Sequence, residues 1–142
     1  MSKDVLGFER KNIAVTSREI LRCCQMISAR MSKLYKYSLG QQLIMCASKL
    51  TSDVYAGLDE IGPSNRKLEL VNRVNMDILE LLPQIRVVKD LNEVNGTDFE
   101  EVIRKIKSTK NQVENWRSYI ITKQEEKNGT TNRILEQETK TE

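Results

Sequence analysis

The stretch KLYKYSLGQQL, residues 33–43, decides the fold. Ser38 is followed three residues later by Gln41, which is the spacing of a capping box, where each side chain bonds a backbone N–H at a helix start. We therefore expect a helix to begin at Leu39. Gly40 falls in its first turn, where the missing side chain lets another backbone or a ligand approach closely. One amphipathic helix is predicted before this stretch and three more after it.

The preceding helix is expected to begin at a second capping box, formed by Thr16 and Glu19. Its apolar residues recur at spacings of three and four, which is typical of one buried helix face. These residues are Ile20, Cys23, Cys24, Ile27, Met31 and Leu34. Residues 1–15 are of mixed composition, and we predict a loosely docked N-terminal arm there. The three cysteines lack metal-ligand spacing, so we expect reduced core thiols in a cytoplasmic protein.

The same spacing predicts two more helices in residues 39–61 and 64–91. Gly62 and Pro63 separate them, because neither residue continues a helix well. Pro83 lies inside the second of these helices and is expected to kink it. The apolar stripe of residues 39–61 runs from Leu39 to Ile61.

The last helix is expected to begin at a third capping box, Thr97 with Glu100. Trp116, the only tryptophan, is expected to anchor one end of the core rather than to stack on a base. Residues 124–142 have few apolar side chains and are predicted to be a disordered polar tail. Residues 16–123 are thus predicted to form an all-α, up-down-up-down four-helix bundle with short connections.

Residue usage excludes several kinds of enzyme. The chain has no histidine, which removes His-activated nucleophiles and His-ligated metal sites. It also has no glycine-rich phosphate loop and no apolar run long enough to span a membrane. We therefore expect a protein that is not an enzyme and that needs no cofactor and no metal. A hydrolase would rest only on scattered carboxylates.

Positive charge is concentrated at the front of the chain. The first 36 residues hold eight basic and three acidic side chains, a net charge of +5, whereas the whole chain has +3. Such a cluster predicts contacts with phosphate, although an ordinary solvated face is the competing interpretation. The candidate nucleic-acid- or partner-binding residues are Arg18, Arg22, Arg30, Lys33 and Lys36, with Lys107, Lys110 and Arg117 on the last helix.

Residues 39–61 also carry apolar side chains outside their main stripe, namely Ile44, Met45 and Tyr55. In a four-helix bundle every helix keeps an outer face, so a helix that is apolar on more than one face is a candidate for a subunit interface. We predict that these three residues lie between copies of the chain.

The stretch KLYKYSLGQ, residues 33–41, resembles a pattern found in accessory variability determinants, four-helix-bundle proteins that accompany the reverse transcriptase of diversity-generating retroelements in phages and bacteria. Two basic residues, an aromatic residue and Ser-Leu-Gly-Gln occupy its positions. IRVVKDL, residues 85–91, resembles the end of the family's third helix, and Trp116-Arg117 resembles a pair in its last helix. Ser32, Asn115 and Pro83 depart from the family's pattern.

The resemblance implies an accessory protein that forms a basic homopentamer and binds the reverse transcriptase together with RNA and possibly DNA. Such a protein supports mutagenic synthesis of cDNA and its transfer into a target gene. The same bundle occurs in proteins encoded by ribosomal-RNA intervening sequences. That relationship would instead imply a protein–protein scaffold with no direct role in binding nucleic acid.

Overall fold

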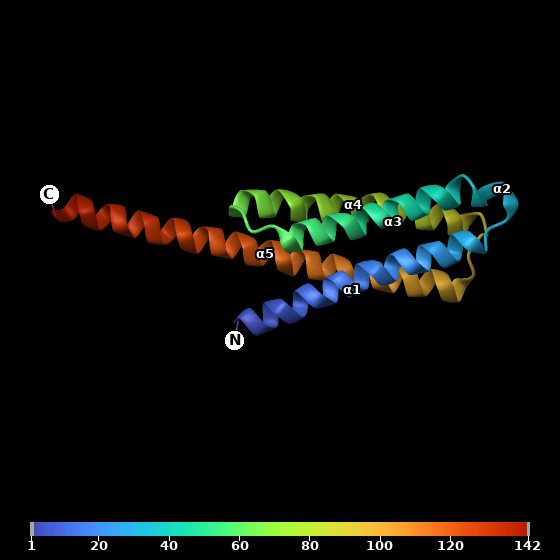
Figure 1. Ribbon diagram of the computed structural model, residues 1–142, viewed down its shortest axis with the longest axis horizontal. Helices are drawn as coiled ribbons and strands as arrows, with labels where there is room; N and C mark the ends of the chain where they lie inside the picture. The colour runs from blue at the N-terminus through green and yellow to red at the C-terminus, as the bar shows by residue number, and fades with distance from the viewer. Residues whose placement is uncertain (1, 142) are drawn as a thin grey trace.

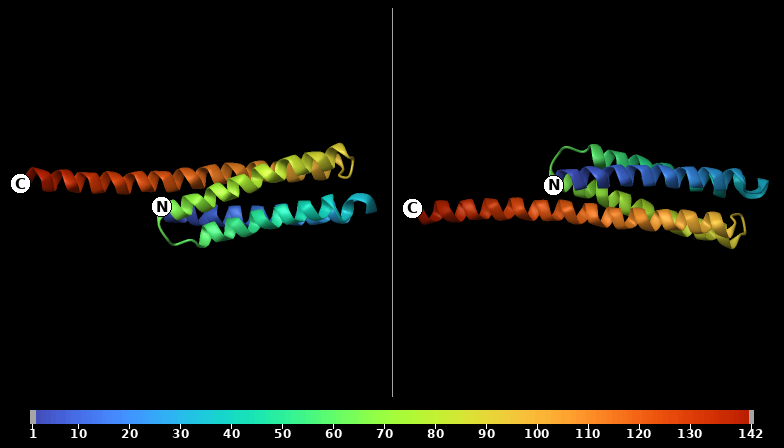
Figure 2. Two further views of the ribbon diagram at one scale, coloured as in Figure 1. Left: turned by 90° about the horizontal axis from the view of Figure 1, so that it is seen from above. Right: turned by 90° about the horizontal axis from the view of Figure 1, so that it is seen from below.

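The computed structural model describes the backbone of residues 2–141 and the side chains of residues 12–129. Four long helices pack in chain order, and the first also contacts the last, which closes the bundle (Figures 1 and 2). The predicted all-α, up-down bundle of four helices is confirmed, whereas its assembly into a pentamer stays a prediction. The helices are α1 (Ser2–Ala29), α2 (Lys33–Lys36), α3 (Leu39–Asp59), α4 (Ser64–Asp90) and α5 (Gly96–Thr141).

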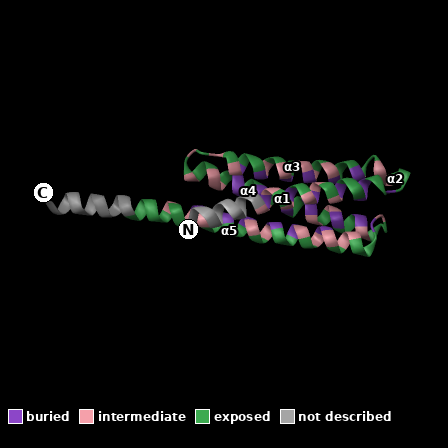
Figure 3. Ribbon diagram, turned by 60° about the horizontal axis from the view of Figure 1, so that its bottom comes forward, coloured by how far each residue is buried: buried purple, intermediate pink, exposed green. Residues whose placement is uncertain are grey.

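The three-four spacing located the core well. Buried residues recur along all four long helices (Figure 3), and most of the predicted apolar stripe is among them. The prediction of burial is wrong for two residues, since Leu34 is 75% exposed and Ile61 is 95% exposed. Leu34 lies in the short helix α2 at the end of the bundle, and Ile61 follows the last residue of α3, so neither side chain has a helix to pack against.

Two helix boundaries differ from the predictions. α1 begins at Ser2, so Thr16 lies inside a helix, and its Oγ1 donates to the carbonyl of Asn12 at 2.7 Å. This bond to the preceding turn is a common alternative for a threonine hydroxyl, and the predicted capping box is wrong. α5 stays helical to Thr141 and runs past the end of the bundle (Figure 1), where a disordered tail was expected. The side chains of residues 1–11 and 130–142 lie outside the described residues.

The other two capping boxes are also wrong in detail. α3 does begin at Leu39, but the Ser38 side chain makes no capping bond and its Oγ instead donates to the carbonyl of Tyr35 at 3.5 Å. α5 begins one residue before Thr97. Its cap is Asn95, whose Oδ1 accepts from the N–H of Asp98 at 2.8 Å. Asparagine is among the strongest N-cap residues, so it fixes this helix start.

α4 stays helical through Pro83. A proline lacks the N–H that would bond the carbonyl four residues earlier, here that of Leu79. Pro83 and Leu79 are both exposed, so water can satisfy this carbonyl and the helix tolerates the proline. The expected kink at Pro83 stays a prediction.

The contact between Trp116 and Gly57 joins helices on opposite sides of the bundle. Trp116 of α5 is 8% exposed and its ring lies directly on the backbone of Gly57 in α3. A Cβ at Gly57 would lie 2.5 Å from Cη2 and 3.1 Å from Cζ2 of the ring. Real Cβ atoms do not come this close to another heavy atom, so only glycine fits here without movement. The predicted role of Trp116 as a core anchor agrees with this packing.

Replacing Gly57 by alanine is expected to lower the free energy of unfolding by about 1–3 kcal/mol, because the large, rigid indole must move. Alanine favours a helix by about 1 kcal/mol over glycine, which offsets part of that loss. Gly129→Ala is the matched control, since nothing lies within 4 Å of its Cβ position. Chemical denaturation of both variants checks this. Equal effects of the two substitutions would show that the Trp116 contact imposes no constraint.

Candidate nucleic-acid interface

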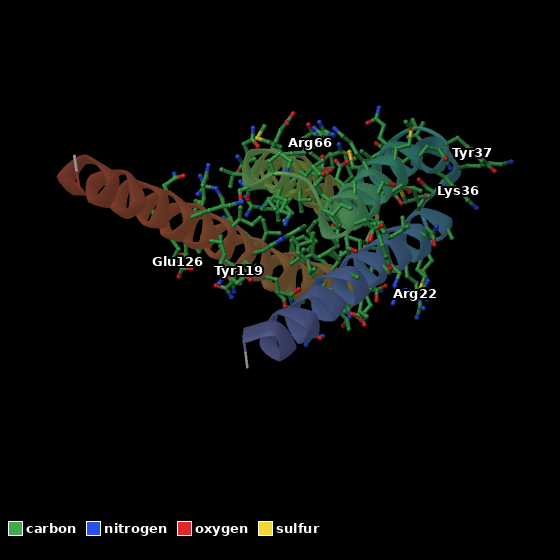
Figure 4. All side chains as sticks on the ribbon, turned by 60° about the vertical axis from the view of Figure 1, so that its left-hand side comes forward. Arg22, Lys36, Tyr37, Arg66, Tyr119 and Glu126 are labelled. Carbon is green, nitrogen blue, oxygen red and sulfur yellow. The ribbon has the colours of Figure 1, made fainter. Side chains whose placement is uncertain are left out.

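The basic residues predicted near the front of the chain lie on the outside of α1 and α2. Within residues 12–36 there are five basic side chains and one acidic side chain, Glu19. Arg18 and Arg22 are one turn apart and exposed, and Arg22 points away from the bundle (Figure 4). Lys33 is exposed and Lys36 is half-buried. None of these four cations has an ion-pair partner among the described side chains.

A groove of about 260 Å³ separates α1 from α5, and its rim is charge-balanced. Arg30 Nη1 bonds Asp98 Oδ2 at 2.9 Å, and Lys105 Nζ bonds Glu19 Oε2 at 2.8 Å. The groove is lined by the three cations Arg22, Arg30 and Lys105 and by the three acids Glu19, Asp98 and Glu101. The groove itself is therefore not a basic channel. Arg22 lies at the rim of this groove and points away from the bundle, whereas Arg18 does not line the groove.

The floor of this groove contains a thiol that is poorly suited to nucleophilic chemistry. Burial, followed by the charge of Glu101, raises the pKa of Cys23 above its ordinary value. Burial raises the pKa of the neighbouring Cys24 to about 12. A thiol that stays protonated at neutral pH is a weak nucleophile, so both side chains act here as packing residues.

The predicted basic residues of α5 do not join those of α1. Lys110 and Arg117 line a different groove, of about 410 Å³, between α5 and α4, and Arg117 Nε donates to Asn72 Oδ1 at 3.1 Å. Lys105, which faces α1, and Lys110 are five residues apart, which is about 140° around a helix. Lys107 is exposed, and its spacing from Lys110 places it on the same side of α5. The eight predicted residues therefore form two separate groups.

Two hydrogen bonds from Ser32 to the carboxylate of Glu93, called the tie below, connect two loops and fix the position of α2. Asn92 ends α4 in the left-handed conformation, with φ of 58°, and the N–H of Glu93 bonds the carbonyl of Val88 at 3.1 Å. This Schellman-type turn directs the Glu93 side chain at Ser32. The carboxylate accepts from the Ser32 N–H at 2.9 Å and from its hydroxyl, which lowers the pKa of Glu93. Ser32 is the residue before α2, so this tie holds the start of that helix.

The predicted interface residues are only partly covered by the monomer. Met45 is 70% exposed and Tyr55 is 36% exposed, whereas Ile44 is half-buried. Ile44 and Tyr55 are eleven residues apart and share one side of α3, while Met45 lies about 100° further around. Their role between subunits stays a prediction. Sequence reasoning missed further exposed apolar residues on α4: Met76, Leu79 and Val87.

A buried carboxyl pair between α3 and α4 was also missed. Asp77 is 2% exposed, and neither of its oxygens, nor Oδ2 of Asp53, has a hydrogen-bond partner among the described residues. Lys49 Nζ lies 3.5 Å from Asp77 Oδ1 but also 3.6 Å from Glu80 Oε2. Burial, followed by the neighbouring Asp53 carboxyl, raises the pKa of Asp77 to about 7, although Lys49 opposes the shift. A proton shared by the two acids would satisfy their oxygens.

The free energy of unfolding is expected to fall as pH rises from about 4 to about 7. In this window folded Asp77 keeps a proton that the unfolded chain releases near its ordinary pKa of about 3.9. The destabilisation is complete above the folded pKa. Asp77→Asn keeps a neutral side chain that can donate to Asp53, so this contribution to the pH dependence should disappear.

Denaturation midpoints measured across this pH range check the prediction. Asp90→Asn is the matched control, because Asp90 is an exposed carboxyl on the same helix with no ion pair among the described residues. It should keep the wild-type slope. An Asp77→Asn variant with the wild-type slope would show that the buried pair does not take up a proton on folding.

Comparison with known proteins adds no family. No protein-family model matches the sequence, and no curated protein matches it. None of the helices in the described part of the chain is long and apolar enough to cross a bilayer. Among the described side chains, no three or more Cys, Asp or Glu residues are grouped so that they could hold a metal ion.

Proposed function

We propose that this protein is a non-enzymatic accessory protein that binds nucleic acid through the outer side of α1 and α2. The observation that carries the proposal is the excess of basic side chains in residues 12–36, five against one acid. Four of the five, Arg18, Arg22, Lys33 and Lys36, lack an acidic partner among the described side chains. Ion pairs within the bundle use Arg30 and Lys105 instead. A basic side chain that forms no ion pair within the bundle remains available to contact phosphate.

The resemblance of residues 33–41 to accessory variability determinants suggests the biological process in which this protein would act. The protein would assist the reverse transcriptase of a diversity-generating retroelement and bind its template RNA or cDNA during mutagenic synthesis. If five copies assemble, the net charge per particle is 5 × +3, or +15. Such a particle would attract a polyanion at long range, and its binding would weaken steeply with salt.

The second candidate is a protein–protein scaffold of the intervening-sequence type. It is favoured by the balanced charges of the α1–α5 groove and by a net charge of only +3. The two proposals differ in one simple property. Protein purified from cells would carry nucleic acid, seen as a raised ratio of absorbance at 260 to 280 nm, only under the first.

Reversing the charge of Arg18 and Arg22 to glutamate is expected to weaken RNA binding strongly without unfolding the bundle, since both side chains are exposed. The slope of log affinity against log salt should become shallower by about 2, one for each lost phosphate contact. Fluorescence anisotropy with a labelled structured RNA measures both quantities.

Arg73→Glu with Arg86→Glu is the matched control. It produces the same change in net charge at two exposed sites of α4, where neither arginine has an ion-pair partner among the described residues. This variant should bind with nearly the wild-type affinity. Equal losses in the two double variants would mean that only total charge matters, and unchanged binding in the first would remove α1 from the interface.

A further inference from the structure

Tyr37 is an exposed aromatic residue at the end of the bundle. It is 70% exposed, and its hydroxyl has no hydrogen-bond partner among the described residues. Leu34, three residues earlier, is 75% exposed. Tyr37 projects from the end of α2 away from the other helices (Figure 4). The tie between Glu93 and Ser32 holds the start of α2, so the ring is displayed from an anchored position.

Two lysines, Lys33 and Lys36, lie within about one helical turn of Tyr37 in the chain. Tyr37 itself has helical dihedral angles, φ of −92° and ψ of −1°, so Lys33 lies one turn before it on the same side. Lys36 is adjacent to Tyr37 in the chain and lies at the same end of the bundle (Figure 4). Neither lysine has an ion-pair partner among the described side chains. An accessible ring between unpaired lysines is the combination that binds single-stranded nucleic acid.

We propose that this α2 tip, defined as Lys33, Leu34, Lys36 and Tyr37, is a stacking site for an unpaired base of single-stranded RNA or DNA. The base would lie on the face of the Tyr37 ring, and the two lysines would contact the flanking phosphates. The inference rests on the proposed function and extends it, because it adds a contact to a base to a surface otherwise made of phosphate contacts. The bases of an intact duplex are already stacked, so the tip discriminates in favour of unpaired segments.

The α2 tip follows α1 directly in the chain, so a nucleic-acid strand bound on α1 would be able to continue onto the tip. Lys33 follows Arg18 and Arg22 along the chain, and the acids that contact the residues between them are already bonded, Asp98 to Arg30 and Glu93 to Ser32. The only acid within residues 12–36 is Glu19, which is paired with Lys105. Surfaces that bind a protein partner are usually depleted of lysine. The unpaired lysines of the α2 tip therefore favour a nucleic acid over a protein as its ligand.

The test compares two ligands of equal charge on the full chain. One is an oligothymidylate of about 20 nucleotides, and the other is an abasic oligonucleotide of the same length. Tyr37→Ala is expected to weaken binding of the first by roughly 5- to 100-fold and to leave the second unchanged, because only the first can stack. Tyr37→Phe keeps the ring and should bind like the wild type. Ile61→Ala, at an exposed site in the distant α3–α4 loop, controls for general loss of apolar surface.

The possible outcomes separate this inference from the proposed function. Wild-type protein that binds both ligands, with no selective loss in Tyr37→Ala, would overturn the stacking site and leave the phosphate surface standing. Equal weakening on both ligands would also overturn it, since it would place Tyr37 in the packing of the tip. Wild-type protein that binds neither ligand at low salt would overturn both proposals.

Discussion

The contact of the Trp116 ring with the backbone of Gly57 is the constraint on which the rest of the bundle depends. These residues belong to α5 and α3, which are not neighbours around the bundle but face each other across its axis. The indole therefore sets how closely the two helices approach, and α1 and α4 pack on either side. Trp116 is the one aromatic residue in the buried core of the described residues, and Tyr35, Phe99 and Tyr119 pack against that core partly buried.

Some charged side chains of this protein form ion pairs between helices, and others remain unpaired and accessible to a ligand. The ion pairs of Arg30 with Asp98 and of Lys105 with Glu19 connect α1 to α5. Lys49 pairs with the buried carboxyl of Asp77. The Arg30–Asp98 pair is the most exposed of these, and exposed ion pairs typically contribute less than about 1 kcal/mol of stability. Cations without such partners also lie on α4 and α5, but residues 12–36 hold five basic side chains and only one acidic side chain. The net charge of +3 therefore understates how uneven the surface is.

The sequence predicted the helices and most of the core because apolar spacing is repeated over many turns, and no single residue decides it. Its local capping patterns failed at Thr16, Ser38 and Thr97, since a hydroxyl can bond a nearby carbonyl and a better cap can lie two residues away. The candidate site was predicted in part, as unpaired cations on α1. The balancing partners could not be predicted, because pairs such as Lys105 with Glu19 join residues that are 86 positions apart.

The most direct test of the central claim, that the unpaired cations of α1 and α2 bind polyanions, is a salt series of RNA binding by the purified full chain, with the particle mass measured on the same sample. Four phosphate contacts per chain predict that log affinity falls linearly with log salt, with a slope of about −3 to −4 for each chain engaged. A particle that binds no RNA even at low ionic strength would contradict the claim. The basic side of α1 would then be a solvated surface or a site for a protein partner.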